Sequence, residues 1–424
     1  MAAQHTSGRG GARPDAVVVG AGLAGLACAL DLTAAGLSVT VLEASDAVGG
    51  RMRTDRRDGF LLDRGFQVFN TSYPQVRRRL DLRSLRLRPF TPGMLLHTPD
   101  GRLRFADPTR RPRQAGDLLR GRLAGPRDLA ALAALGARDA FAPAAAVRGR
   151  PGGREPDARR ALRAAGFSPA FVERMWRPFL SGVFLEDELA TSARFLHLVW
   201  RSMLRGTLCL PAGGIGAVPR ALAARLPPGT VRLETPVREV TGEGVVTADG
   251  EEVPARAVVV ATDGRTAAAL LPGVDAPAGR AVTTFYHAAP LSPLPEPTLL
   301  VDTERHVLNT VVLSEVAPGR SPDTRALVST SVLGAAGEAD EPRVRARLGE
   351  LYGTGSATDR WEHLATYAIP DALPAMEPPL VLSRTTRVAP GRYVCGDHRA
   401  TGSVQGALAS GARAAREAAA FLRA

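Results

Sequence analysis

The sequence contains no lysine, few aromatic residues and only three cysteines among its 424 residues. All 54 basic residues are therefore arginines, and against 42 acidic residues they give a net charge of +12. No platform that combines basic and aromatic residues is visible, so we expect the arginines to be solvated over the surface. The sequence thus predicts no nucleic-acid partner.

Long apolar runs are also missing. No stretch approaches the about 18 consecutive apolar residues that a membrane-spanning helix needs. Residues 1–14 are polar and glycine-rich, lack the apolar core of a secretory signal, and are expected to form a disordered tail. Cys28, Cys209 and Cys395 lie far apart without metal or redox spacing, which predicts small buried side chains in a reducing compartment. We therefore expect a cytoplasmic protein without a metal site.

One segment, Arg77–Arg88, concentrates positive charge and leucine. It contains Arg77, Arg78, Arg79, Arg83, Arg86 and Arg88, with Leu80, Leu82, Leu85 and Leu87 between them. This mixture is typical of a membrane-surface segment, so we single it out for peripheral membrane contact. The alternative is a set of arginines on an ordinary solvated surface.

The first motif lies near the N-terminus. Ala16–Val19 is a short β-branched run that predicts a buried parallel strand. It leads directly into Gly20–Gly25, a G-x-G-x-x-G, followed by helical spacing of apolar residues up to Gly36. A second strand, Ser38–Leu42, then ends at Glu43. Strand, glycine turn, helix and acidic residue in this order predict a dinucleotide-binding unit.

Each residue of this motif has a physical role. Gly20 permits the tight turn, Gly22 removes a Cβ that would block a pyrophosphate, and Gly25 lets the helix pack on the sheet. The free N–H groups and positive dipole end of the helix then face the phosphates. Glu43 can accept hydrogen bonds from both hydroxyls of an adenosine ribose, and its charge disfavours a 2′-phosphate.

The next segment distinguishes FAD from NAD. After Glu43 come Gly49-Gly50-Arg51, Met52–Thr54, and then Gly59-Phe60 and Asp63-x-Gly65. The two glycines allow the backbone near a cofactor, and Arg51 offers a guanidinium fork for a diphosphate. This pattern resembles the flavin-containing amine oxidase superfamily, which includes amine oxidases, protoporphyrinogen oxidase and the phytoene-type carotenoid desaturases. The resemblance implies FAD as the cofactor.

The C-terminus carries the same resemblance. Arg392–Asp397 predicts a strand that ends in Gly-Asp, and Gly402–Ala407 opens a closing helix. In the resembling family the Gly-Asp contacts the ribityl and phosphate region, and the helix directs its N-terminus at the flavin pyrimidine edge. Without a ligand, Asp397 would be a turn residue and Ser403 an N-cap. The resemblance also implies that the Val237 backbone contacts the adenine.

These observations together assign an architecture and a cofactor site. We predict an α/β fold with a discontinuous, Rossmann-like (GR2-type) FAD-binding domain at 15–75, 206–275 and 385–424, and an α+β substrate domain at 76–205 and 276–384. The predicted cofactor-binding residues are Gly20, Gly22, Leu23, Ala24, Gly25, Glu43, Ala44, Gly50, Arg51, Gly65, Phe66, Val237, Gly396, Asp397, Ser403 and Val404.

The expected substrate domain has two recognisable parts. Aromatic residues gather between Phe167 and Met203, either as a packed helical core or as an apolar tunnel for a lipophilic substrate. The stretches 281–287, 307–313 and 326–331 alternate apolar and polar residues, which predicts an antiparallel sheet below the cavity.

The lack of lysine and of one aromatic residue near the C-terminus guides the choice of reaction. Amine oxidases of the resembling superfamily generally hold a lysine near flavin N5, and many carry an aromatic residue inside the final G-x-x-x-G. This chain has no lysine and has Ser403 at that place. We therefore predict an FAD-dependent oxidoreductase that abstracts a hydride from a mainly apolar small molecule, as phytoene-type desaturases do. The alternative is a flavin amine oxidase or a protoporphyrinogen-type oxidase that uses oxygen.

No catalytic residue is assigned from the sequence. The candidates for proton transfer are His197, His287, His363 and His398, and for each of them a structural role is the alternative. His398 is the strongest of the four because it directly follows Asp397.

Overall fold

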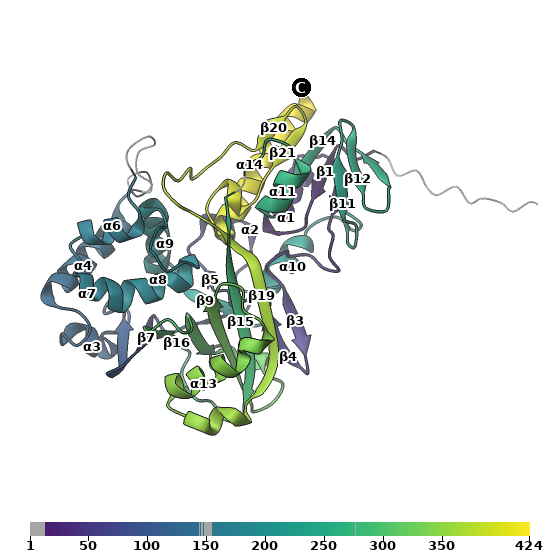
Figure 1. Cartoon of the computed structure of the whole chain (residues 1–424). Coiled ribbons are helices and arrows are strands. Elements are labelled where there is room, and N and C mark those ends of the chain that lie inside the picture. Colours follow the sequence, from purple (N-terminus) through teal and green to yellow (C-terminus); the bar gives the residue numbers. More distant parts are fainter. Residues whose placement is uncertain (1–12, 144, 146, 148–154, 276) are drawn as a thin grey trace, which may run out of the picture.

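The computed structural model describes residues 13–143, 145, 147, 155–275 and 277–424. Residues 1–12 of the predicted tail lie outside this range. The two largest sheets among the described residues have six and seven strands, and Figure 1 shows a layer of helices beside the seven-stranded sheet. Within the described residues, no helix is both long enough and apolar enough to span a bilayer.

The first sheet is built from strands of three distant parts of the chain. Its order is β10-β2-β1-β14-β21-β20, and all neighbours are parallel except β20 and β21. The strands are β1 (Ala16–Val19), β2 (Val39–Leu42), β10 (Val231–Arg232), β14 (Ala257–Val260), β20 (Arg387–Ala389) and β21 (Arg392–Val394). β1 and β14 are fully buried valine-rich runs, as expected for parallel strands covered on both faces. The predicted Rossmann-like α/β class is confirmed.

The second sheet is mixed and has the order β19-β15-β18-β17-β16-β7-β8. Its strands are β7 (Gly93–Thr98), β8 (Gly101–Ala106), β15 (Gly279–Ala289), β16 (Leu299–Asp302), β17 (Asn309–Val312), β18 (Ala326–Leu333) and β19 (Glu362–Pro374). The antiparallel strands expected between 281 and 331 are present. The sequence did not indicate that β7 would join β16 in parallel.

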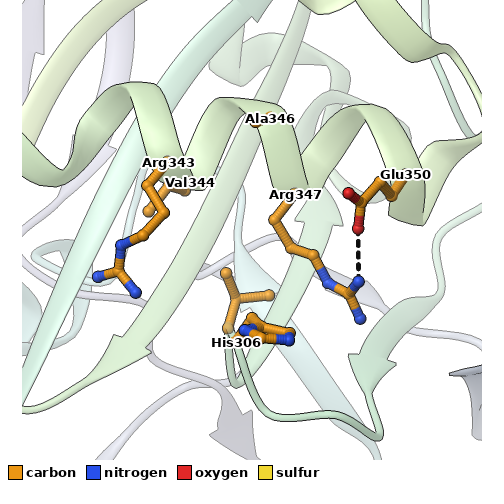
Figure 2. Close-up of a pocket in the computed structure, with 7 residues that line it drawn as sticks. His306, Arg343, Val344, Ala346, Arg347 and Glu350 are labelled. Carbon is orange, nitrogen blue, oxygen red and sulfur yellow. Dashed lines mark hydrogen bonds and ion pairs between the residues drawn. The ribbon is translucent and has the colours of Figure 1, made fainter.

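Helix α13 (Glu341–Tyr352) packs with this sheet through apolar residues such as Val344 and Leu348. Its arginines bind acidic neighbours, and Figure 2 shows Arg347 reaching Glu350. Arg347 also pairs with the buried Asp302 at 2.6 Å. The small hollow of about 230 Å³ beside this helix is therefore lined by an arginine whose charge is already neutralised.

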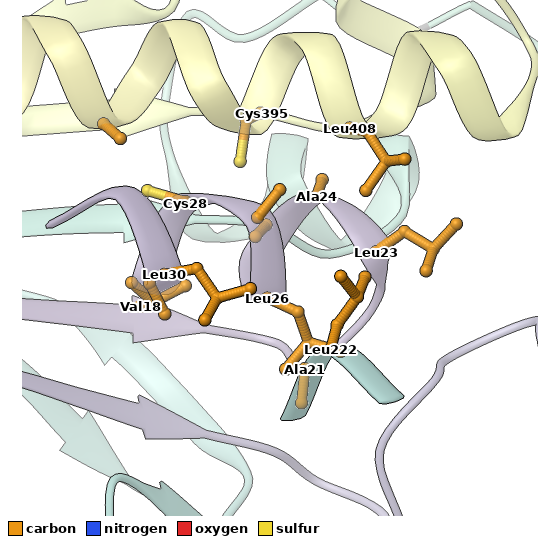
Figure 3. Close-up of a cluster of buried hydrophobic side chains, with 14 of the residues drawn as sticks. Val18, Ala21, Leu23, Ala24, Leu26, Cys28, Leu30, Leu222, Cys395 and Leu408 are labelled. Carbon is orange, nitrogen blue, oxygen red and sulfur yellow. The ribbon is translucent and has the colours of Figure 1, made fainter. Parts of the chain in front are cut away.

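The largest buried cluster lies where helices α1 (Leu23–Ala34) and α14 (Val404–Arg423) cross (Figure 3). A Cβ placed on Gly411 would lie 2.1 Å from the Ala24 carbonyl oxygen, so only glycine allows the two helices this close. Cys28 and Cys395 lie in this cluster, and all three cysteines are free and buried, as predicted. Helix α14 therefore packs closely against helix α1.

The helical layer consists of α3 (Gly116–Leu119), α4 (Pro126–Phe141), α6 (Ala158–Ala164), α7 (Pro169–Phe171), α8 (Arg177–Phe184) and α9 (Ala193–Arg205). Its aromatic side chains pack against one another. The Trp176 and Trp200 rings lie 4.9 Å apart, and Phe167 stacks on Phe171 at 5.6 Å. These rings belong to one buried cluster, which favours the packed helical core over the alternative of an apolar tunnel.

In the described part of the chain, the remaining strands form three small sheets of two or three strands each, and the remaining α-helices are short. They are β3 (Thr54–Arg57), β4 (Phe60–Asp63), β5 (Phe69–Asn70), α2 (Pro74–Arg79), β6 (Leu87–Pro89), β9 (Leu208–Pro211), α10 (Ala217–Ala223), β11 (Val237–Val240), β12 (Gly244–Thr247), β13 (Glu252–Pro254), α11 (Gly264–Leu270) and α12 (Leu313–Val316). Phe60, Leu62 and Leu210 share one core cluster with strands of the mixed sheet. The predicted domain boundaries stay a prediction.

A buried ion pair joins β4 to a segment that follows strand β17 of the mixed sheet. Arg320 Nη1 lies 2.7 Å from Asp63 Oδ2, and both side chains are almost completely excluded from solvent. Asp63 Oδ1 also accepts hydrogen bonds from the Thr54 hydroxyl at 2.7 Å and the Ile215 amide at 2.9 Å. The Tyr286 hydroxyl donates to the Asp63 carbonyl at 2.8 Å. One aspartate thus ties together four separate segments.

The leucines of Arg77–Arg88 point away from solvent. Leu80 and Leu85 belong to the same buried cluster as α1, and Leu82 and Leu87 pack against that cluster. Arg79 is also buried and pairs with Asp31 at 2.6 Å. The apolar half of the proposed membrane-surface pattern is therefore used inside the fold.

Candidate cofactor site

Four predicted site residues, together with Asp263, which was not predicted, lie at one edge of the parallel sheet. Gly20 follows β1, Glu43 follows β2, Asp263 lies beyond the end of β14, and Gly396 and Asp397 lie beyond the end of β21. The carboxyl ends of parallel strands share an edge, and α/β proteins bind ligands where the connections leave in opposite directions. Here β1 is followed by β2 on one side, while β14 and β21 lie on the other.

The glycine turn leaves space in front of helix α1. Gly22 is the N-cap and supplies no side-chain hydrogen bond to the first turn, where Leu23 and Ala24 are buried. A Cβ on Gly22 would meet no atom within 4 Å, whereas one on Gly25 would lie 1.9 Å from the Gly20 carbonyl oxygen. Gly25 therefore serves packing, and Gly22 faces open space at a positive helix end.

Glu43 is held beside this turn. Its carboxylate accepts hydrogen bonds from the Ala21 amide at 2.6 Å, from the Ser45 hydroxyl at 2.6 Å and from the Ser45 amide at 3.0 Å. A carboxylate has about four acceptor positions, so about one remains for a ribose hydroxyl. The Thr235 amide donates to the Glu43 carbonyl at 2.8 Å, which brings the start of β11 and Val237 close to this end of the site. Ala44 is exposed next to Glu43.

Arg51 connects the two ends of the chain. Its Nη2 lies 2.7 Å from Asp397 Oδ1, and its Nη1 donates to the Ala372 carbonyl at 2.8 Å. The neighbouring Asp397 carboxylate raises the pKa of the Arg51 guanidinium. Gly50 lies beside the turn, because a Cβ on it would be 3.6 Å from the Gly22 Cα. The structure thus places the G-G-R segment between the glycine turn and the Gly-Asp.

A cavity of about 610 Å³ opens beside this pair. Its lining includes Arg51, Asp263, Asp371, Asp397 and His398. Ion pairs balance much of the charge, since Arg265 binds Asp371 at 3.1 Å and Arg51 binds Asp397. A volume of this size is typical of small-molecule and cofactor sites.

The other predicted residues lie where the two sheets meet. The Phe66 amide donates to the Thr284 hydroxyl at 3.2 Å, so strand β15 of the mixed sheet holds this segment. A Cβ on Gly65 would lie 2.5 Å from Ile369 Cδ1 on β19. Ser403 caps helix α14, because its hydroxyl accepts a hydrogen bond from the Gly406 amide at 3.1 Å, and Val404 is the first helical residue.

Of the four candidate histidines, only His398 lines the cavity. The other three have partners elsewhere: His197 Nδ1 binds Asp139 at 2.8 Å in the helical layer. His287 Nε2 binds Glu341 at 2.8 Å, and His363 Nε2 binds the Thr366 hydroxyl at 2.9 Å. The first three histidines are therefore engaged elsewhere in the fold.

Sequence reasoning missed several residues that shape the site. The Gln67 amide donates to the Arg51 carbonyl at 2.8 Å, and Thr284 holds Phe66. Gln67 lies two residues after the Asp63-x-Gly65 motif, so its position was a usable signal. Thr284 belongs to a strand more than two hundred residues away, and no sequence pattern connects it with Phe66.

The comparison with protein families identifies the chain. The model of the flavin containing amine oxidoreductase family matches residues 23–419. The chain belongs to this family. Family membership makes it an oxidoreductase with FAD as its cofactor. The predicted superfamily and cofactor are thus confirmed.

Individual relatives of this flavin containing amine oxidoreductase are similar over short stretches. The chain is 44% identical over 69 residues to protoporphyrinogen oxidase 2 of Arabidopsis thaliana, covering 16% of the chain and 14% of that protein. It is 44% identical over 75 residues to an L-amino-acid oxidase of Crotalus adamanteus, covering 18% of the chain and 14% of that protein. The chain therefore matches about one seventh of the length of these curated relatives.

The fold is shared over the whole chain with a solved structure. Cyclohexylamine oxidase from Brevibacterium oxydans superposes with a TM-score of 0.71 at 19% identity, covering 97% of this chain and 100% of that one. These relatives correspond to the predicted alternative, an amine or protoporphyrinogen-type oxidase, more closely than to a phytoene-type desaturase.

The residues present fit FAD. The turn at Gly22 is open where a Cβ would stand, and the uncapped first turn of α1 offers N–H groups to a diphosphate. Arg51 lies at the same sheet edge and offers a positive charge to the diphosphate. Glu43 offers a hydrogen-bond acceptor to a ribose hydroxyl. The individual cofactor contacts of the flavin containing amine oxidoreductase remain predictions.

We expect Arg51→Ala to weaken FAD binding by about 10- to 100-fold, because a charge-assisted hydrogen bond contributes about 1.5–3 kcal/mol. The Arg51 side chain is 37% exposed, so its loss should lower apo-protein stability by no more than about 1 kcal/mol. Titration of the apo-protein with FAD and thermal unfolding measure the two effects. Arg64→Ala is the control, because Arg64 is 41% exposed and pairs with Asp55. Equal melting losses with and without FAD would contradict a binding role.

Proposed function

We propose that the chain is an FAD-dependent oxidase that dehydrogenates a small organic molecule and passes the electrons to oxygen. The observation that carries the proposal is the 2.7 Å contact between Arg51 and Asp397, which unites the G-G-R and Gly-Asp segments beside a cavity. Membership of the flavin containing amine oxidoreductase family supports it. In such a reaction the substrate loses a hydride and a proton, and oxygen becomes hydrogen peroxide.

Bound FAD would supply the hydride acceptor. The residues of the chain then have to bind and orient it. Arg51 and the first turn of α1 would hold the diphosphate, and Glu43 the ribose. The N-terminus of α14, capped by Ser403, would place a positive helix end near the negative charge of a reduced flavin.

We favour an apolar substrate over an amine. An aromatic cage attracts an amine cation or presents its C–N bond, and Ser403 cannot do so. Its hydroxyl is already engaged as the cap of α14. The sequence has no lysine to bind a water near the flavin. A porphyrinogen-type substrate needs neither group, because dehydrogenation depends mainly on hydride acceptance and exclusion of water.

The test starts with the absorbance spectrum of the purified protein. We expect a flavin spectrum that bleaches when a reduced tetrapyrrole is added without oxygen, and that returns with peroxide formation when air is admitted. Primary amines and an apolar polyene serve as the competing substrates. If only amines bleach the flavin, the proposal of an apolar substrate is wrong and the chain is an amine oxidase. If oxygen does not reoxidise the reduced flavin, a desaturase with another electron acceptor is favoured.

Peripheral membrane contact of Arg77–Arg88 stays a prediction. Because the four leucines pack in or against the core, such contact would depend on the exposed arginines alone. Binding to anionic vesicles should then disappear at high salt.

A further inference from the structure

His398 is the cavity residue whose hydrogen bonds are unaccounted for. Its exposed fraction is 3%, which places it among the buried polar residues. In the part of the chain that the structure describes, neither Nδ1 nor Nε2 has a hydrogen-bond partner. Buried polar side-chain atoms are nearly always bonded to protein, water or a ligand, so two free ring nitrogens in a cavity wall indicate a missing partner.

The fold fixes the ring in this place. His398 lies in the short helical turn Asp397–Arg399 that follows strand β21. The ring folds back over Gly396, because a Cβ on that glycine would lie 2.5 Å from the ring atoms Cε1 and Nδ1. The side chain is therefore held beside the Arg51–Asp397 pair by a position that only glycine can occupy.

The chemistry of the ring is that of a neutral imidazole. Burial lowers the pKa of His398 to about 4, and the nearby Asp397 carboxylate compensates only in part. At neutral pH the ring therefore offers one N–H donor and one acceptor nitrogen. Arg51 already supplies the positive charge of the site, so His398 adds hydrogen-bonding capacity without a second cation.

We propose that His398 is a cofactor-binding residue of this chain, which donates one hydrogen bond to the ribityl-diphosphate part of FAD and accepts another from it. That part of the cofactor presents hydroxyl donors and phosphate acceptors together, which matches the two nitrogens. This inference rests on the proposed function, since it requires FAD in the cavity edge that Arg51 and Asp397 form. It assigns to His398 a binding role and no proton transfer.

The experiment compares His398→Phe with the unchanged chain. Apo-protein is titrated with FAD, the dissociation constant is measured by quenching of flavin fluorescence, and thermal unfolding is recorded without FAD. We expect the dissociation constant to rise about 10-fold or more, because two hydrogen bonds are lost. The melting temperature of the apo-protein should stay equal or rise, since phenylalanine removes two unsatisfied polar atoms from a buried position.

Two further variants make the result specific. His398→Gln keeps one donor and one acceptor and should bind FAD with an intermediate constant, and it replaces the phenylalanine variant if that one does not fold. His306→Phe is a control outside the cavity, because His306 is an exposed histidine that lines a separate hollow beside α13, and its replacement should leave FAD binding unchanged.

The outcomes separate this inference from the proposed function. An unchanged chain that folds but does not bind FAD overturns both. An unchanged chain that binds FAD, together with His398→Phe binding it equally well, overturns only the role of His398 and leaves a water molecule as the partner of its ring.

Discussion

A Gly22→Val chain is expected to fold normally and to purify without flavin. A Cβ on Gly22, the N-cap of α1, would meet no atom of the described residues within 4 Å apart from its own chain neighbours. Its cost to folding is the loss of a glycine N-cap, about 1 kcal/mol or less. Its cost to binding is steric exclusion of the diphosphate from the helix end, for which we expect at least a 100-fold loss of FAD affinity.

Absorbance of the purified variant and FAD titration of its apo-form measure this effect. Gly25→Ala is the contrasting variant, because its Cβ would lie 1.9 Å from the Gly20 carbonyl oxygen and should destabilise the fold itself by several kcal/mol. A Gly22→Val protein that still retains flavin would contradict the prediction that the diphosphate binds at this turn.

Breaking the buried Asp63–Arg320 pair should have the largest effect on stability. Arg320→Met is expected to lower the free energy of unfolding by about 3–5 kcal/mol, because it leaves the Asp63 charge buried without its partner. The two hydrogen bonds that Asp63 Oδ1 accepts compensate only part of that charge. Urea denaturation of both proteins, monitored by circular dichroism, gives the difference.

The control for this variant is Arg343→Met, which breaks an exposed pair with Asp340 and should change stability by less than about 1 kcal/mol. A double variant, Asp63→Leu with Arg320→Met, should be less destabilised than the sum of the two single variants, because no uncompensated charge remains. Additive losses would show that the two groups do not depend on each other.

The first nucleotide-binding unit could be predicted almost completely from the sequence. Ala16–Val19 is apolar and β-branched, the glycines follow at once, and the apolar residues after them have helical spacing. Such local patterns determine both the secondary structure and its order, and the observed strands and α1 differ from the expected ranges by only a few residues. The burial of the cysteines was predicted from their lack of metal or redox spacing, and all three are buried.

The sequence did not determine whether apolar and aromatic side chains face a packed core, a cavity or a membrane surface. The aromatic residues between Phe167 and Met203 have the same composition whether they line a tunnel or fill a core. The leucines between Arg77 and Arg88 likewise have the same spacing whether they face lipid or protein. Only the neighbours brought by distant parts of the chain distinguish these alternatives, and here those neighbours are core residues.

By itself, the sequence determined that this protein carries a dinucleotide turn near its start and a Gly-Asp segment near its end. These motifs depend on backbone conformation and helix ends, which neighbouring residues impose. Only the tertiary structure decided that Arg51 meets Asp397, that Asp63 meets Arg320, and that the His398 side chain lines the cavity beside Arg51 and Asp397. Those residues are far apart in the sequence and become neighbours only when distant strands and loops have come together, so no local pattern encodes the contacts.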